Sequence, residues 1–307
     1  MKDPVRDDFS FARMNILGLY LSSVLIWGST WFAITFQFGS VPPAVSVAYR
    51  FLLSAFILLA WCLFKRLPLR FTMKEHLWML VQGILLFGIN YVCVYLAEME
   101  VTSALVAVVF SLVVFLNIAG TRIFFGTPVK PATLVGAVLG VSGILLVFLP
   151  EFSRGTGKGD GTLGLVLALV GAVSASLGNI VASRNYRRGL PVVQMNTFGM
   201  FYGAMVVAGY ALLTGQPFVF DWSSRYLLSL TYLAVFGSIL AFGAFLTLIG
   251  RIGADRAGYV AVAIPVVALL FSALFEGLQW HWSLIVGMLL CLAGNVAVLG
   301  GRKGRET

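Results

Sequence analysis

The segment VAVAIPVVALLFSALFEG, residues 260–277, decides the fold because it is long, almost wholly apolar and contains a proline, Pro265. A helix rises about 1.5 Å per residue, so about 20 such residues cross the hydrocarbon core of a bilayer. Proline frees a backbone carbonyl, which is tolerated at membrane depth where it is buried in protein or lines a wet cavity. The segment therefore predicts a membrane span that borders a cavity and ends at Glu276.

The rest of the chain resembles this segment in composition. Of 307 residues, 60% are hydrophobic and 11% are charged, whereas a water-soluble domain is roughly a quarter charged. So few polar residues could not cover the surface of a soluble helical protein. The three cysteines, Cys62, Cys93 and Cys291, lie inside apolar runs and are expected to be free, buried thiols. We predict an all-α integral membrane protein.

Ten apolar runs are long enough to span a membrane. They are residues 14–36, 43–64, 76–97, 101–121, 131–150, 161–183, 192–213, 226–249, 256–275 and 281–300. The loops that connect these runs contain glycine, proline or charged residues, and none is long enough to form a soluble domain. The sequence therefore predicts ten transmembrane helices.

Lysine and arginine are distributed unevenly between the two ends of these spans. With both tails on one side, 17 of the 21 Lys and Arg residues lie on that side and three on the other, while Arg50 lies inside a span. Cytoplasmic loops are enriched in Lys and Arg, so both termini are expected in the cytoplasm. The net charge of +9 is thereby explained as a topology signal, and no nucleic-acid partner is expected.

The chain repeats itself weakly at a shift near 150 residues. Residues 104–114, ALVAVVFSLVV, align with residues 258–268, GYVAVAIPVVA, and the glycines at both ends of 136–143 align with those of 287–294. We predict two five-span repeats, residues 1–150 and 151–307. Five is odd, so the second repeat would enter from the opposite side, and such inverted repeats enclose a central site in transporters.

The motifs IWGSTWF, residues 26–32, and PVVALLFSALFEG, residues 265–277, resemble the drug/metabolite transporter superfamily. The closest resemblance is to its EamA-type members and, within them, to YddG-like exporters of aromatic amino acids. It covers essentially the whole chain and implies a multi-pass protein of the bacterial inner membrane. It also implies that spans 1, 3, 4, 6, 8 and 9 surround a cavity and that spans 5 and 10 pack together. The first repeat departs from the pattern, with Ser111 in place of proline and Arg122 in place of glutamate.

Polar and aromatic residues recur at helical spacing on one face of span 3, and similar faces occur on spans 1 and 6. Each could instead serve packing between helices through weak hydrogen bonds. The predicted cavity residues are Trp27, Thr30, Trp31, Gly83, Phe87, Asn90, Tyr91, Tyr95, Glu98, Ser174 and Asn179.

Three further residues are expected to have structural or gating roles: Arg50, Pro265 and Glu276. Arg50 lies roughly 10 Å from the outer end of span 2. An unpaired buried arginine is costly, so Glu98, Glu100 or a substrate carboxylate should pair with it, unless it reaches the surface. Glu276 ends span 9 and is expected to be solvated, to pair with His281, or to contact substrate.

The absence of charged residues from the cores of several predicted spans limits the classes of substrate that we expect. The cores of spans 6–9 contain no Lys or Arg, which disfavours phosphorylated substrates, and no span contains a deep Asp or Glu, which disfavours proton-driven export of cationic drugs. We predict a secondary transporter that exports amino acids or related small metabolites, with aromatic or apolar side chains preferred. We expect it to act as a monomer, without metal or cofactor.

Three alternatives remain. Other metabolites or drugs of the same superfamily are possible substrates, and a channel is a less favoured architecture because of the internal repeat. An intramembrane enzyme would need a nucleophile and base or a metal cluster. The two histidines, His76 and His281, are predicted at opposite ends of the spans and could not meet.

Overall fold

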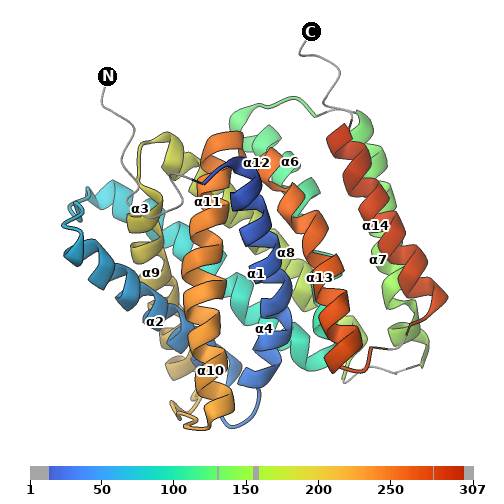
Figure 1. Ribbon diagram of the computed structural model, residues 1–307, viewed down its shortest axis with the longest axis horizontal. Coiled ribbons are helices and arrows are strands. Elements are labelled where there is room, and N and C mark those ends of the chain that lie inside the picture. The colour runs from blue at the N-terminus through green and yellow to red at the C-terminus, as the bar shows by residue number, and fades with distance from the viewer. Residues whose placement is uncertain (1–13, 130, 155–158, 279, 301–307) are drawn as a thin grey trace.

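The computed structural model describes residues 14–129, 131–154, 159–278 and 280–300, and within these ranges it consists of helices and their connections (Figure 1). Seven helical segments are long and apolar enough to cross a membrane. Shorter apolar helices fill the remaining three predicted spans at Leu134–Leu149, Ala263–Phe275 and Trp282–Gly294. The all-helical membrane architecture predicted from the sequence is therefore confirmed.

The first five predicted spans correspond to the following helices. They are α1 (Ile16–Ile34) with η2 (Thr35–Gln37), α2 (Pro43–Phe64), α3 (Met73–Gln82) with η3 (Gly83–Ile89) and α4 (Asn90–Glu100), α5 (Ser103–Phe110) with α6 (Val113–Phe125), and α7 (Pro131–Arg154).

The last five spans follow in the same way. They are α8 (Gly161–Arg187), α9 (Val192–Leu213), α10 (Ser224–Tyr232) with η4 (Leu233–Leu240) and α11 (Ala241–Ile252), α12 (Ala254–Ala257) with α13 (Tyr259–Phe275), and α14 (Trp282–Gly300).

Local sequence explains where several helices begin and end. Pro43 occupies the first turn of α2, where its missing N–H would lack a partner in any case. Thr72 and Glu75 form a capping box at the start of α3, so the third span begins at Met73, earlier than its apolar residues predict. Gly126 ends α6 with φ 70°, a left-handed conformation that glycine adopts readily.

The third and eighth spans each contain a π-helical segment near the middle of the span. η3 begins at Gly83 and η4 begins at Leu233, 150 positions apart. π-Helical turns are rare and are frequent at functional sites. The same distortion therefore occurs at matching places in the two halves of the chain.

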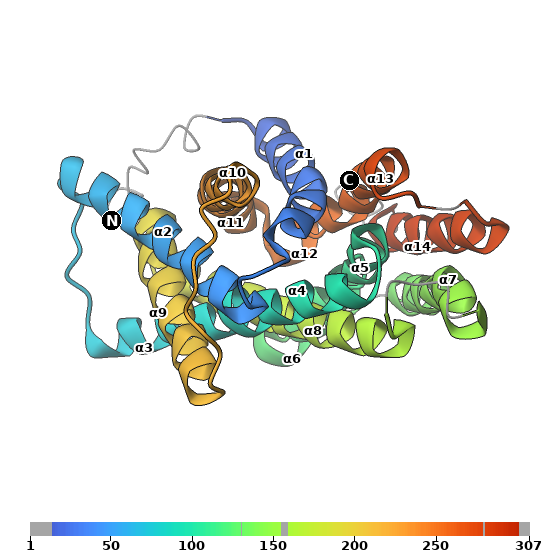
Figure 2. The same cartoon turned by 90° about the horizontal axis from the view of Figure 1, so that it is seen from below.

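Helices α7 and α14 pack against each other at one side of the molecule (Figures 1 and 2). A Cβ atom on Gly143 would lie 2.4 Å from the carbonyl oxygen of Gly287, and one on Gly294 would lie 2.5 Å from that of Gly136. Glycines spaced by seven residues thus let the two backbones approach closely. This pairing of spans 5 and 10 was expected from the family resemblance.

Helices from six of the spans form a ring of contacts. Helix α1 contacts α11 and α13, α13 contacts α5, and α8 contacts α4, α5 and α11. These helices come from spans 1, 3, 4, 6, 8 and 9, which the resemblance placed around the cavity. Figure 2 shows the same elements grouped between the α2–α9 pair and the α7–α14 pair.

Pro265 lies inside a continuous helix, since α13 runs from Tyr259 to Phe275. Span 4, by contrast, is interrupted between α5 and α6 at Ser111 and Leu112. Ser111 is the residue that aligns with Pro265 in the predicted repeat. The interruption therefore lies in the half that lacks the proline.

Candidate functional site: an aromatic cavity between the two halves

A cavity lies between α1, the middle of span 3, α5, the start of α6, α8, α11 and α13. The space free of protein atoms in it amounts to about 720 Å³, its open mouth included. Six aromatic side chains line it: Trp27, Trp31, Tyr91, Phe110, Phe242 and Phe245.

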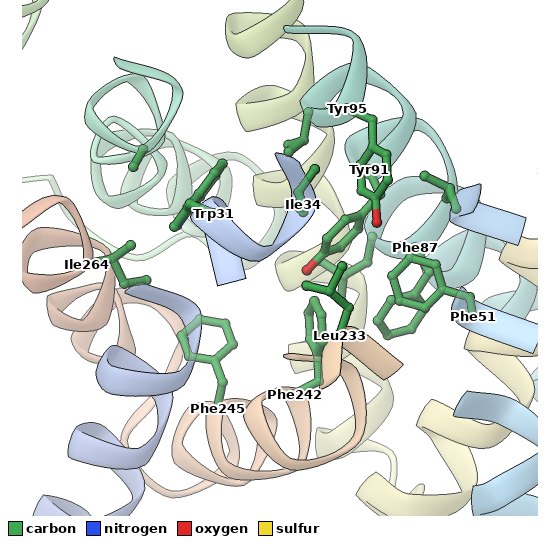
Figure 3. Packing of buried hydrophobic residues seen from close by; sticks show 14 of the residues in the cluster. Trp31, Ile34, Phe51, Phe87, Tyr91, Tyr95, Leu233, Phe242, Phe245 and Ile264 are labelled. Carbon is green, nitrogen blue, oxygen red and sulfur yellow. The ribbon is translucent and has the colours of Figure 1, made fainter. Parts of the chain in front are cut away.

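The polar lining is sparse. Thr30, Asn90 and Asn179 are the polar, non-aromatic side chains among the described lining residues, and none of those lining residues is charged. The rings of Tyr91 and Phe242 lie on one side of the central space, and Trp31 and Phe245 lie on the other (Figure 3). The wall can therefore contact a flat or bulky apolar group, with a few hydrogen-bonding groups to orient it.

Six of the predicted cavity residues line this space: Trp27, Thr30, Trp31, Asn90, Tyr91 and Asn179. They come from α1, α4 and α8, as the face analysis of spans 1, 3 and 6 indicated. The structure thus brings together the predicted residues of three separate spans.

Two other predicted residues, Gly83 and Phe87, lie behind the wall. A Cβ on Gly83 would be 2.3 Å from the carbonyl oxygen of Gly199, so Gly83 serves the close approach of η3 to α9. Phe87 is fully buried, and its ring packs 5.2 Å from that of Phe51 and 4.9 Å from that of Phe242. Phe87 therefore supports the cavity side chain Phe242 from outside.

The remaining three predicted residues are buried away from the cavity lining. Tyr95 and Glu98 continue the face of α4 beyond Tyr91 and are almost fully buried. Ser174 donates a hydrogen bond of 2.7 Å to the carbonyl oxygen of Leu85 in η3. Ser174 thus satisfies a backbone group of the π-helical segment.

Sequence reasoning missed Phe110, Phe242 and Phe245. These residues lie in stretches without polar side chains, 104–110 in span 4 and 239–246 in span 8, so periodicity gives no sign of which face meets the cavity. One signal was present, since the FG pair at 242–243 matches the FG pair at 87–88 in the predicted repeat.

Trp27 and Gly28 each have a distinct role in the wall. The Trp27 indole donates a hydrogen bond of 3.1 Å to the carbonyl oxygen of Gly237 in η4. Its ring packs edge-to-face on Phe242 and Phe245, at 4.9 Å from each. A Cβ on Gly28 would lie 2.4 Å from that of Val267, so this glycine lets α13 approach α1. The pair thus joins α1 to α11 and α13.

Arg50 is fully buried and does not reach the surface. Its Nε donates a hydrogen bond of 3.0 Å to the hydroxyl of Ser238 in η4, and its guanidinium lies 4.5 Å above the ring of Tyr91. Within the described ranges its two Nη atoms have no hydrogen bond of ordinary geometry, although Tyr91 and Tyr95 lie within electrostatic reach. Arg50 therefore links α2 to η4 through Ser238 and contacts one face of the Tyr91 ring.

The carboxylates expected to pair with Arg50 make other contacts. Glu100 accepts a hydrogen bond of 2.7 Å from the backbone N–H of Asp160 at the start of α8. Glu98 lies within electrostatic reach of Tyr95. As far as the structure describes the chain, the side-chain hydrogen bond that Arg50 donates goes to the hydroxyl of Ser238, and its pairing with a carboxylate stays a prediction.

Glu276 ties two helices together at one end of the bundle. Its carboxylate accepts hydrogen bonds from Ser103 at 2.8 Å and from Ser272, and the two hydroxyls are 3.1 Å apart. Ser103 begins α5 and Glu276 caps α13. The lining residues of α13, by contrast, lie between Val260 and Ile264, at its other end. The tie therefore joins α5 to α13 at the end of α13 farther from its lining residues.

The described residues thus form an all-helical bundle with an aromatic cavity that both halves of the chain line. The sequence profile of the EamA-like transporter family matches residues 14–149 and residues 162–300. The chain therefore belongs to the EamA-like transporter family.

Similar proteins carry names of the same kind. The Escherichia coli strain K12 protein named uncharacterized inner membrane transporter YedA is 30% identical over 264 residues, covering 84% of this chain and 82% of that one. The Bacillus subtilis strain 168 protein named uncharacterized transporter YoaV is 24% identical over 281 residues, covering 91% and 94%. A solved crystal structure at 21% identity shares the fold with a TM-score of 0.70, over 94% of this chain and 98% of that one.

Proposed function

We propose that this transporter exports amino acids or closely related small metabolites and prefers those with aromatic or bulky apolar side chains. The observation that carries the proposal is the cavity wall, which presents six aromatic rings and no ionised side chain among its described residues. Such a wall favours an apolar body with a compact polar head.

The wall also bears on affinity. An aromatic pair contributes about 0.5–1.5 kcal/mol beyond area burial, and ordering the ligand offsets part of any such gain. Binding is therefore expected to be weak, on the order of millimolar, which suits an exporter that must release its substrate.

A phosphorylated substrate fits this cavity poorly. Phosphate recognition uses Arg or Lys as charge-assisted donors, and the buried Arg50 lies behind Tyr91 rather than among the lining residues. Uncharged apolar metabolites or drugs are the second candidate, because the aromatic wall would accept them equally well.

Alternating access is the proposed mechanism. Two matches to one family profile and two π-helical segments 150 positions apart support a repeat of two halves, 1–150 and 151–307, which we propose is inverted in the membrane. The tie at Glu276 joins α5 to α13 at one end of the bundle. With both termini in the cytoplasm, we propose that this end is the external one and that the tie keeps it closed.

We also propose the bacterial inner membrane as the location and the monomer as the working unit. The names of similar proteins, such as inner membrane transporter YedA, support the location. Helices from both halves of the chain line the cavity, so a single copy contains the parts that the proposed mechanism needs.

A metabolite-export screen tests the proposal. Cells that overproduce the parent protein and cells that overproduce a Phe242→Ala variant would be compared for amino acids released into the medium. Increased release of aromatic or bulky apolar amino acids by the parent alone is the expected result. Release of sugar phosphates without any amino acid would refute the proposal.

A further inference from the structure

Two asparagines of the cavity wall present carbonyl oxygens that lack a partner. Asn90 is 5% exposed and Asn179 is 3% exposed, and both line the cavity. Among the described residues, neither Oδ1 atom accepts a hydrogen bond. A buried acceptor without a donor is costly, so a donor on the bound ligand would relieve a penalty already present in the protein.

The orientation of Asn90 follows from chemistry. Its Nδ2 donates a hydrogen bond of 3.1 Å to the carbonyl oxygen of Leu86. A backbone carbonyl can only accept, so the amide nitrogen must face Leu86 and the amide oxygen must point away from it.

The same residue, Leu86, brings the second amide close. A Cβ on Gly178 would lie 2.9 Å from the Cβ of Leu86 and 3.1 Å from its backbone nitrogen. Helix α8 therefore packs directly on η3 at this point. Asn179 follows Gly178 in the chain and lines the same cavity, so both amides belong to one part of the wall.

Two acceptors in one part of the wall favour a ligand rich in donors. An ammonium group has three donors and no acceptor, and its charge-assisted hydrogen bonds are roughly twice as strong as neutral ones. Aromatic rings attract cations through their faces, and Trp27 and Phe242 line the same cavity. Arg50 lies behind Tyr91, with its guanidinium 4.5 Å from that ring, and is not among the described lining residues.

We infer that Asn90 and Asn179 form an ammonium subsite, which binds the primary amino group of the substrate while the aromatic wall holds its side chain. This inference rests on the proposed function, because it names the part of an amino acid that the cavity recognises. It makes the amino group, rather than the carboxylate, the main determinant of selection.

The test compares ligands that differ in one group. The parent protein would be reconstituted in proteoliposomes and loaded with labelled tryptophan, and exchange would be inhibited with tryptamine, indole-3-propionate or tryptophol. Tryptamine should inhibit, while indole-3-propionate and tryptophol should be weaker by about tenfold or more, the change that about 1.4 kcal/mol produces. Equal or stronger inhibition by either of the latter two would overturn the inference.

Variants provide a second line of evidence. Asn90→Leu and Asn179→Leu should each reduce the preference for tryptamine over indole-3-propionate. Asn117→Leu is the matched control, since Asn117 is also a buried amide without a hydrogen bond in the described structure but does not line the cavity. A preference that survives in both folded cavity variants would overturn the inference.

The two proposals can fail separately. If the parent protein exchanges no amino acid, the proposed function is wrong. If it exchanges tryptophan but does not distinguish tryptamine from indole-3-propionate, the function stands and the ammonium subsite is wrong.

Discussion

Replacing Gly83 by alanine tests whether this residue serves helix packing or the cavity. The new Cβ would lie 2.3 Å from the carbonyl oxygen of Gly199 and 3.0 Å from the nitrogen of Gly203. Both atoms belong to the backbone of α9, so no side-chain rotation can relieve the contact. Overpacking of this kind costs about 1–3 kcal/mol, whereas alanine gains about 0.5–1 kcal/mol over glycine in a helix. We expect a net loss of stability of about 1–2 kcal/mol.

Gly209→Ala is the matched control. Gly209 lies in α9 as well, but a Cβ there would have no neighbouring atom within 4 Å. Only the higher helix propensity of alanine over glycine then changes the stability, so this variant should be stabilised by up to about 1 kcal/mol. The two glycine-to-alanine changes should therefore have opposite signs.

Unfolding of the purified proteins in detergent, by heat or denaturant, would measure the difference. A Gly83→Ala protein as stable as the parent would refute the close approach of η3 to α9. If that variant also lost substrate exchange at unchanged stability, Gly83 would contact substrate, as the face of span 3 predicts from sequence.

Three further predictions concern residues outside the cavity lining. Arg50→Ala should lower the free energy of unfolding by about 1.5–3 kcal/mol because it removes a charge-assisted hydrogen bond. Ser238→Ala removes the same hydrogen bond, so the losses from the two substitutions should not add in the double variant, and full additivity would contradict the contact. Glu276→Ala should lower thermal stability because α5 and α13 lose their shared hydrogen bonds, and an unchanged melting temperature would contradict that tie. A reporter fused after Lys303 should report the cytoplasm and one inserted within 151–160 the outside; an external C-terminus would contradict the ten-span topology.

Much of the fold could be predicted because membrane spans depend on length and composition. Runs of about 20 apolar residues and their flanking charges are visible in any window of the sequence. The glycines of spans 5 and 10 also indicated a close helix pair, and Gly143 and Gly287 form it.

The π-helical segments could not be predicted. Their extra residue shifts the helical face by a fraction of a turn, and the apolar residues on both sides hide that shift. The shift decides which side chains of span 3 reach the cavity: Asn90 and Tyr91 line it, whereas Phe87 and Gly83 do not. A glycine or phenylalanine on a helix face fits either packing or a cavity, and only the neighbouring helix decides between them.

Arg50 illustrates a second limit. The sequence indicates that a buried arginine needs a partner, and nearby glutamates were the natural candidates. One partner is the hydroxyl of Ser238, which lies 188 positions away in the chain and is brought close by η4. Polar contacts between the halves depend on tertiary structure that no local pattern encodes.

Counterflow in proteoliposomes tests the central claim most directly. Vesicles containing the parent protein and loaded with unlabelled phenylalanine would be diluted into labelled phenylalanine, tryptophan, threonine or a sugar phosphate. We predict transient accumulation of labelled phenylalanine and tryptophan above that of threonine, none of the sugar phosphate, and reduced accumulation in a folded Tyr91→Ala variant. Accumulation of the sugar phosphate alone, or of no amino acid in vesicles that contain folded protein, would contradict an aromatic cavity that transports amino acids.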